Sequence, residues 1–249
     1  MKKHKFLKPE YSSKVIGAIF ILISIYLFLR TDHRNAGLAA AFIGIFTLLI
    51  VHYPTVEEDV AVAELKSAVL SYDGLLQDLE VSENGVILPP GDNLTKARVY
   101  VPAGKFEGVP DIYDEMAIVS SDRGRTGVAL VPPGQPLLEE AKNRIKYEIE
   151  GEGIQSGREC MGHLSKGMGL AKSFSFREKE DKIRIRITLD RYDDYCENLR
   201  ESSPNICTRT GCPICSAYLT SASEALSSPL KIENFEKENN HIKYRLEEV

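Results

Sequence analysis

The residues best suited to chemistry in this chain are four cysteines within one stretch of twenty residues. Their spacing is C-x10-C-x4-C-x2-C, and the positions are Cys196, Cys207, Cys212 and Cys215. The two-residue spacing of "CPIC" lets both of its sulfur atoms face one metal ion across a tight turn. Four thiolates are ligands that suit zinc at a closed tetrahedral site. We therefore predict a structural zinc site formed by these four side chains.

Other uses of the same thiols stay open. The spacing C-x4-C-x2-C also matches plant-type iron–sulfur proteins, but their fourth ligand lies downstream and no cysteine follows Cys215. An iron–sulfur cluster is therefore less favoured than zinc. Cys212 and Cys215 could instead be a redox pair, because the start of a helix, predicted at Cys215, lowers the pKa of a thiol. The preceding residues do not predict the strand of a thioredoxin-like motif. Unligated packing thiols are the remaining alternative.

Two further residues could add metal ligands. Cys160 and His163 lie in "CMGH" on a predicted helix, although a lone histidine is more often a surface residue and a cysteine a small buried apolar one. Familiar catalytic motifs are absent, because "GMGLAKS" lacks the glycine before Lys172 that a phosphate loop needs, and neither H-E-x-x-H nor G-x-S-x-G occurs. We predict no catalytic residue and favour a protein that is not an enzyme.

The cysteines must be positioned by the elements around them. Residues 137–249 are predicted to hold two helices, two strands, the cysteine loop, a helix and two strands, which together indicate an α+β domain with an antiparallel sheet. In residues 182–189, Ile and Leu alternate with Lys, Arg and Thr, so one strand face is buried. The cationic face could bind an anion, but a solvated surface is favoured. Residues 83–136 are predicted to be β-rich.

The N-terminal part is predicted to cross a membrane twice. Residues 15–30 and 35–53 are two nearly uncharged runs, separated by a short polar linker, and they indicate a transmembrane helical hairpin. The basic segment 1–14 places the N-terminus in the cytoplasm by the positive-inside rule. Two crossings return the chain to that side, so the α+β region is predicted to be cytoplasmic and the protein to be a two-span protein of the cell membrane. This location weakens the case for disulfides.

The juxtamembrane segment 54–82 is predicted to be an amphipathic helix. It could dimerise the protein as a coiled-coil-like stalk, but packing against its own domain is favoured. The net charge of the 249-residue chain is -5. This mild acidity argues against broad nucleic-acid binding, which needs a basic surface to neutralise phosphates.

The C-terminal part, from about residue 138 to 249, resembles the 4-vinyl reductase small-molecule-binding domain, whose fold is shared with TRAPP trafficking subunits. The similarity lies in "GRECMGHLSKGMGLAK", the paired strands, the segment "GCPICSAYLTSASEAL" and the closing hairpin. It implies a domain that binds small, often hydrophobic ligands and that can hold metal through Cys207, Cys212 and Cys215. The glycines usual after the cysteine motif are replaced here by Thr220, Ser221 and Ser223.

The whole layout also looks like uncharacterised two-span membrane proteins of archaea, a group that implies no activity. Taken together, the sequence predicts a membrane-anchored cytoplasmic protein that binds a ligand or partner and is stabilised by zinc. A thiol redox protein that uses Cys212 and Cys215 is one alternative. A non-catalytic scaffold that dimerises through its juxtamembrane helix is the other.

Overall fold

The structure is a computed structural model that describes residues 9–30, 34–52, 58–91, 93–120, 125–145, 153–179 and 182–249. The chain divides into two compact units, Met1–Val60 and Ala61–Val249, and each is described by itself. Of the predicted basic segment 1–14, the first eight residues lie outside the described part of the chain.

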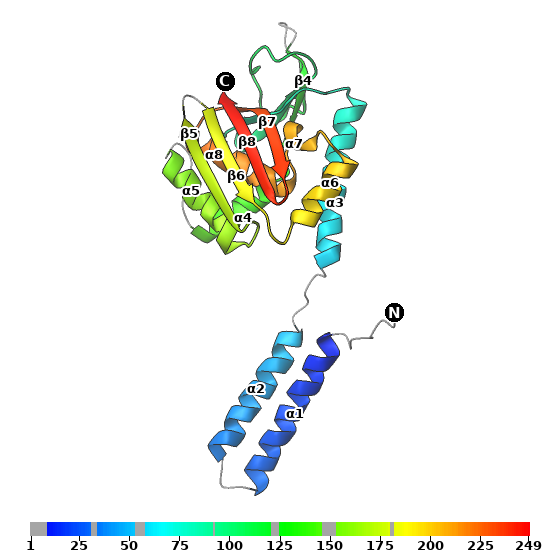
Figure 1. The fold of residues 1–249 in the computed structure, drawn as a ribbon, viewed down its shortest axis with the longest axis vertical. Helices are drawn as coiled ribbons and strands as arrows, with labels where there is room; N and C mark the ends of the chain where they lie inside the picture. The colour runs from blue at the N-terminus through cyan, green and yellow to red at the C-terminus, as the bar shows by residue number, and fades with distance from the viewer. Residues whose placement is uncertain are drawn as a thin grey trace. The chain divides into compact units, whose positions relative to one another are not determined.

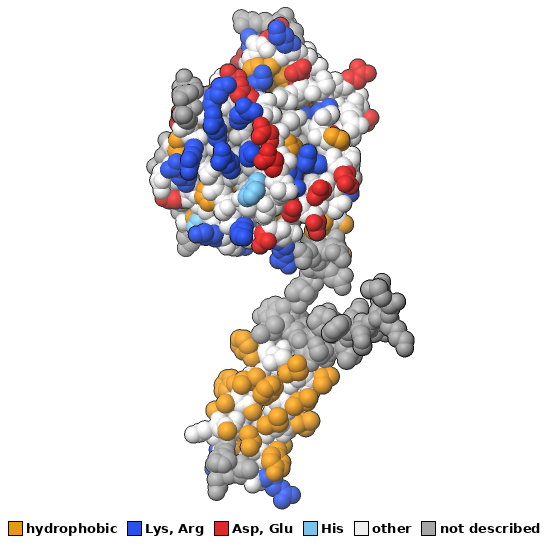
Figure 2. Space-filling model, in the orientation of Figure 1, with side chains coloured by type: hydrophobic (Ala, Val, Ile, Leu, Met, Phe, Trp, Pro, Cys, Tyr) orange, Lys and Arg blue, Asp and Glu red, His pale blue; other side chains and the backbone are white. Residues whose placement is uncertain are grey.

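The first unit is a pair of helices, α1 (Pro9–Arg30) and α2 (Arg34–His52), which pack side by side in opposite directions (Figure 1). The uncharged runs are therefore helical, as predicted. Most of their large apolar side chains are exposed, and Figure 2 shows them covering much of this unit's visible surface. Leu29 and Phe42 are among the most exposed.

The predicted transmembrane hairpin is not supported by these helices. Within the residues that the structure describes, no helix has both the length and the apolar character needed to span a membrane. Although α1 has 22 residues, its longest uncharged part is the run 15–29, which rises only about 22 Å as a helix, whereas a bilayer's hydrocarbon core is about 30 Å thick. The prediction of a two-span membrane protein, with its membrane localisation, is therefore wrong, and the cytoplasmic orientation deduced from it loses its basis.

The second unit is built on one eight-stranded sheet with the strand order β3-β4-β2-β1-β7-β8-β6-β5. Every paired neighbour is antiparallel, so the predicted α+β content and antiparallel sheet are confirmed. The strands are β1 (Val86–Leu88), β2 (Arg98–Pro102), β3 (Ile118–Val119), β4 (Gly127–Leu130), β5 (Ser173–Lys179), β6 (Lys182–Thr188), β7 (Leu230–Glu238) and β8 (His241–Glu248).

Helices cover one face of this sheet (Figure 1). They are α3 (Glu58–Asp78), α4 (Gln135–Ile145), α5 (Ile154–Gly162), the π-helix η1 (His163–Gly167), α6 (Asp193–Ser202), α7 (Ile206–Arg209) and α8 (Pro213–Leu226). The central helix is α8, in which every residue from Pro213 to Ala225 is buried. Both α4 and α5 pack against α8, which places it at the middle of the core.

Two helices form where the sequence predicted only a cysteine loop. In α6, the acidic Asp193 and Asp194 lie in the first turn, where the helix dipole favours negative charge. Cys196 and Leu199 form its buried side, together with Tyr195. The helix α7 is a single turn that buries Ile206 and Cys207. These helices were missed because each is short and α6 is mostly polar.

The hairpin formed by β5 and β6 shows why one sheet face is buried and the other is not. In β6, Ile183, Ile185 and Ile187 are buried and alternate with exposed Lys182, Arg184 and Arg186. Burying one isoleucine side chain contributes about 1.5–3 kcal/mol. The buried face therefore fixes the register of the strand, and the cationic side chains are left on the opposite face.

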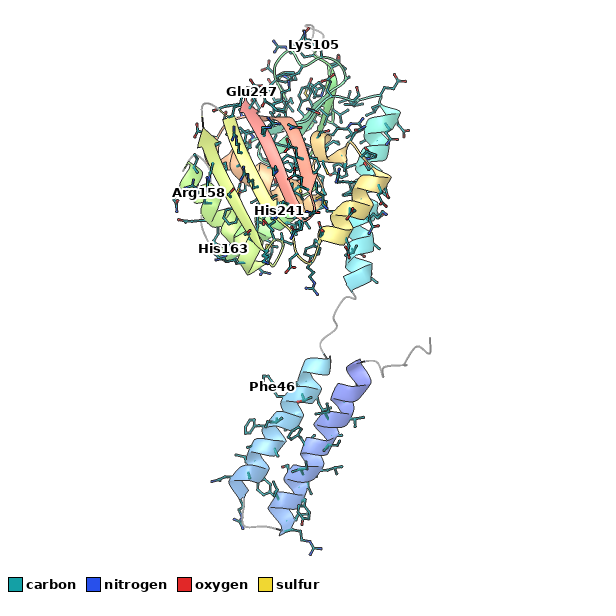
Figure 3. The ribbon with its side chains drawn as sticks, in the orientation of Figure 1. Phe46, Lys105, Arg158, His163, His241 and Glu247 are labelled. Atoms are coloured by element: carbon teal, nitrogen blue, oxygen red, sulfur yellow. The ribbon has the colours of Figure 1, made fainter. Side chains whose placement is uncertain are left out.

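A hydrogen bond at β5 and an ion pair at α3 hold the outer elements of the second unit in place. Strand β5 ends the sheet, and Arg158 Nε of α5 donates a hydrogen bond to the carbonyl oxygen of Phe176 at 3.1 Å (Figure 3). On α3, Val69 and Leu76 belong to the core, and Asp73 pairs with Arg209 at 3.3 Å. The amphipathic helix therefore packs on its own domain, and dimerisation through it stays a prediction.

Candidate functional site

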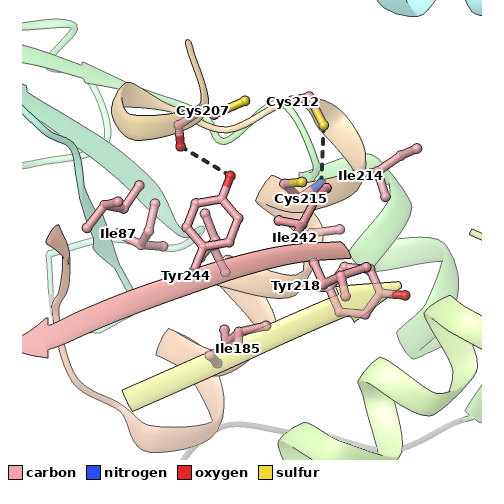
Figure 4. Close-up of a cluster of buried hydrophobic side chains, with 14 of the residues drawn as sticks. Ile87, Ile185, Cys207, Cys212, Ile214, Cys215, Tyr218, Ile242 and Tyr244 are labelled. Atoms are coloured by element: carbon pink, nitrogen blue, oxygen red, sulfur yellow. Dashed lines mark hydrogen bonds between the residues drawn. The ribbon is translucent and has the colours of Figure 1, made fainter. Parts of the chain in front are cut away.

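The four clustered cysteines meet inside the second unit. Cys196 lies on α6, Cys207 on α7, and Cys212 and Cys215 lie at the start of α8. Each is at most 1% exposed, and all four belong to one hydrophobic core. Figure 4 shows the last three beside Tyr244, whose hydroxyl donates to the carbonyl oxygen of Cys207 at 3.2 Å. The fold therefore encloses the four residues that were predicted as ligands in one buried core.

The start of α8 fixes the geometry of the "CPIC" pair. Cys212 is the N-cap residue with an extended backbone, and Pro213 follows at the first helical position, which needs no N–H donor. The backbone N–H of Cys215 donates to Sγ of Cys212 at 3.4 Å. A sulfur atom here replaces the oxygen of a usual N-cap side chain. The side chain of Cys212 therefore caps the N-terminus of α8.

The buried thiols differ in their affinity for protons. A hydrogen bond from the Cys215 side chain lowers the pKa of Cys212, and the same bond raises the pKa of Cys215 well above its ordinary value. Burial raises the pKa of Cys196 to about 12 and that of Cys207 well above 9.0, and the charge of Cys212 adds to both increases. One sulfur atom is therefore the preferred place for negative charge, while the other three keep their protons.

The predicted metal centre is not formed by these side chains. A zinc site needs its sulfur ligands about 2.3 Å from one common point. Among the described residues, no group of three or more His, Cys, Asp or Glu side chains is arranged to hold a metal ion. The prediction of a metal-binding protein is therefore wrong for this arrangement. The choice of zinc over an iron–sulfur cluster stays a prediction from the cysteine spacing alone.

The two additional ligand candidates do not join this cluster. Cys160 is buried on α5, where burial raises its pKa to about 11 and where Ser221 and Glu224 are its neighbours. His163 is exposed and lies at the start of the π-helix (Figure 3). It lines a separate open hollow with Arg144 and Lys166.

A second candidate site lies on the outer face of β5, β6 and β8, which none of the described helices covers (Figure 1). Five cationic side chains point outward from three neighbouring strands and form what we call the basic face: Arg177, Arg184, Arg186, Lys243 and Arg245. Arg184 lies directly opposite Arg177 on one side and Arg245 on the other. Figure 2 shows Lys and Arg side chains gathered over β5 and β6, beside a strip of acidic ones. The register thus brings together cations that are far apart in the sequence.

The acidic strip neutralises only part of this charge. Lys243 pairs with Glu238 at 2.8 Å, and Arg245 pairs with Glu236 at 3.0 Å. In the part of the chain that the structure describes, no carboxylate forms an ion pair with Arg177, Arg184 or Arg186. The side of the basic face towards β5 therefore keeps a net positive charge.

Two adjoining hollows follow the basic face. The first has a volume of about 270 Å³ and is lined by Arg184, Arg186, Glu236, Lys243, Tyr244 and Arg245. The second, of about 380 Å³, shares Arg186 and Lys243 with the first and adds hydroxyl groups from Ser173, Ser175 and Thr188. Thr188 Oγ1 and His241 Nδ1 lie 3.2 Å apart at its far end. The arrangement can hold an anion between guanidinium and hydroxyl donors.

Comparison with known protein families shows to which family the chain belongs. A family model described as a domain of unknown function, DUF7982, matches residues 16–246. The chain belongs to the DUF7982 family. The match covers most of the helical pair, nearly the whole sheet and all five cysteines, so both candidate sites lie inside the family domain. Neither the curated proteins nor the solved structures give a match to the chain. The resemblance to the 4-vinyl reductase domain stays a prediction.

Sequence reasoning only partly identified the basic face. The alternation in 182–189 indicated a cationic strand face, which was interpreted as a solvated surface. Arg177 and Arg245 were not singled out, because their positions opposite Arg184 depend on strand order and register. The sequence predicted the β5–β6 hairpin and the β7–β8 hairpin. It did not predict that pairing of β6 with β8 joins the two hairpins.

Proposed function

We propose that this protein binds a small ligand carrying two or more phosphate groups on the basic face of its sheet. The observation that carries the proposal is the row of three arginines, Arg177, Arg184 and Arg245, beside a hollow of about 270 Å³. Like charges directly opposite each other destabilise a sheet, by roughly 0.2–1 kcal/mol per pair. A bound anion that bridges the arginines would offset this cost.

The spacing of the cations favours a ligand with more than one anionic group. Arg184 and Arg245 form one cross-strand pair, and Arg186 and Lys243 form the next pair on the same face. Residues two apart on a strand are separated by about 6.6 Å. Two phosphate groups of one ligand could therefore each contact one pair. The planar guanidinium groups suit phosphate oxygens because they can donate two parallel hydrogen bonds.

The same surface does not favour nucleic acid. Binding to a single strand usually needs aromatic side chains on which bases stack. Among the described outward-pointing residues of β5, β6 and β8 there is no Phe, Tyr or Trp. The absence of nucleic-acid binding stays a prediction from the acidic composition. The small hydrophobic ligand implied by the family resemblance stays a prediction, because five of the six residues that line the first hollow are charged.

A calorimetric titration of the full chain tests the proposal, with pyrophosphate as the probe. We expect the Arg184→Gln and Arg186→Gln variants each to bind at least about tenfold more weakly, because a hydrogen bond to a charged group contributes about 1.5–3 kcal/mol. Binding should also weaken as the salt concentration rises from about 0.05 to 0.3 M, because exposed charges are screened.

A matched control separates this site from the general charge of the molecule. Lys105 is exposed on a loop and is not part of the basic face (Figure 3). Lys105→Gln removes one positive charge, as each arginine variant does, and should leave the affinity unchanged. The proposal fails if the wild-type chain does not bind pyrophosphate, or if Lys105→Gln weakens binding as much as Arg184→Gln.

A further inference from the structure

The side chains on the outer face of the sheet line up in rows that cross its strands. Each row takes one residue from β5, β6, β8 and β7, because these strands pair directly in that order. Three successive rows are formed by Arg177, Arg184, Arg245 and Asn234, by Ser175, Arg186, Lys243 and Glu236, and by Ser173, Thr188, His241 and Glu238. We call them the first, second and third row. The first two rows contain the basic face, and the third row adjoins it.

The positive charge decreases from row to row. The first row holds three arginines and no carboxylate, and the second holds two cations and one carboxylate. The third row has no Lys or Arg, and its carboxylate, Glu238, lies directly opposite His241. A third phosphate group would lie beside this carboxylate with no arginine or lysine in its own row. The first two rows therefore suit phosphate groups, and the third row suits a neutral part of the ligand.

The third row can form hydrogen bonds with hydroxyl groups. Thr188 Oγ1 and His241 Nδ1 lie 3.2 Å apart, and Ser173 is directly opposite Thr188 on the other side. A hydroxyl group both donates and accepts, so it can bond to the hydroxyls of Ser and Thr and to an imidazole nitrogen. The second hollow, of about 380 Å³, is lined by these three side chains together with Arg186 and Lys243. One hollow thus joins the cations of the second row to the polar groups of the third.

We propose that the ligand of the basic face is a diphosphate ester of a sugar, with its phosphate groups on the first two rows and its sugar hydroxyls on the third. This inference rests on the proposed function and names the class of ligand for the same site. Residues two apart on a strand are separated by about 6.6 Å, so the third row lies one such step beyond the second. A sugar bonded directly to the diphosphate reaches that step. An ester with an apolar tail would displace water from the third row without replacing its hydrogen bonds.

Calorimetric titrations of the full chain with two nucleotides test this proposal. The probes are adenosine 5′-diphosphate and its 2′,3′-dideoxy analogue, which have the same charge and the same base and differ only in the ribose hydroxyls. We expect the wild-type chain to bind adenosine diphosphate about fivefold more tightly, because a hydrogen bond between neutral groups contributes about that factor. Equal affinities for the two nucleotides would overturn the proposal.

Variants assign this preference to the third row. Thr188→Val removes the hydroxyl and keeps the branched side chain that suits a strand, and it should reduce the preference to about twofold or less. Arg184→Gln should weaken the binding of both nucleotides and leave their ratio unchanged. Ser120→Ala is the matched control, because Ser120 is an exposed serine outside the three rows, and it should keep the full preference. A preference that survives in Thr188→Val would contradict the proposal.

A pyrophosphate titration separates the failure of this inference from the failure of the proposed function. If the wild-type chain binds pyrophosphate and both nucleotides without distinguishing the two nucleotides, the sugar inference fails and anion binding stands. If it binds none of the three, the proposed function fails and this inference fails with it. The two nucleotide titrations of the wild-type chain decide alone if Thr188→Val does not fold.

Discussion

Arg184 has a cation opposite it on each neighbouring strand and no acidic partner among the described residues. Lys182 is the preceding outward-facing residue of β6. It forms an ion pair with Glu233 at 3.2 Å. Two side chains of the same strand thus differ in their surroundings although the sequence pattern treats them alike. A face that only needed to be solvated would gain stability from an acid or a hydroxyl at position 184.

Replacing Arg184 should therefore stabilise the fold while weakening anion binding. In Arg184→Gln, the repulsion from Arg177 and Arg245 is removed, and we expect the free energy of unfolding to rise by roughly 0.2–1 kcal/mol. Urea denaturation at low salt measures this change. In Lys182→Gln, the contact with Glu233 is lost, so the free energy should stay the same or fall by less than about 1 kcal/mol. A lower stability of Arg184→Gln would show that the arginine supports the fold.

At the scale of elements, α8 organises the core because other elements approach it closely. Gly134 precedes α4, and a Cβ atom added there would lie 2.1 Å from the backbone nitrogen of Ala217. Lys142 of α4 also forms an ion pair with the fully buried Glu224 of α8. The chain can pass this close only because Gly134 has no side chain.

Gly134→Ala should consequently destabilise the second unit. The added methyl group meets the α8 backbone, which cannot rotate away, and overpacking typically costs about 1–3 kcal/mol or more. Thermal denaturation should show a lower midpoint. Gly104→Ala is the matched control, because nothing lies within 4 Å of a Cβ at Gly104. Equal midpoints for the two variants would exclude the close packing of Gly134 against α8.

Elements with strong periodicity could be predicted from the sequence, and those defined by tertiary contacts could not. Ile183, Ile185 and Ile187 identified β6 and its buried face, and the closing hairpin was recognised in the same way. The helix α6 was missed, because its few apolar residues become informative only when a core lies beside them. The burial of the four thiols could not be predicted from their spacing, because it depends on how α6, α7 and α8 pack.

At the scale of the whole molecule, composition alone predicted neither the environment of the N-terminal helices nor where charge gathers on the surface. The uncharged runs predicted a membrane hairpin, whereas the described helices lack the length and apolar character to span a membrane. The net acidity of the chain likewise did not predict the basic face, because Lys and Arg side chains gather over β5 and β6 on the folded surface (Figure 2). Net charge describes the chain as a whole, and a binding surface depends on where the charges lie.

The buried thiols should make the folded chain sensitive to alkaline pH. Burial raises the pKa of Cys160 from 9.0 to about 11 and that of Cys196 to about 12. Above pH 9 the unfolded chain releases these protons while the folded chain retains them, so the free energy of unfolding falls as the pH rises from 9 towards 12. The lowered pKa of Cys212 acts in the opposite direction for one group only.

Urea denaturation under reducing conditions, from pH 8 to pH 11, measures this dependence. The Cys160→Ala variant lacks one of the thiols with a raised pKa. Its free energy of unfolding should therefore fall less steeply as the pH rises. A free energy of unfolding that stays constant from pH 8 to pH 11 would contradict the burial of these thiols.

The central claim is that an anionic ligand occupies the outer face of β5, β6 and β8. Nitrogen-15 NMR of the full chain during a pyrophosphate titration tests it most directly, because it locates the binding surface. We predict saturable shifts of the amides of Ser175, Arg186 and Lys243, and their loss in the Arg184→Gln, Arg186→Gln double variant. Absent shifts, or shifts centred on the hollow of His163 and Lys166, would contradict the claim.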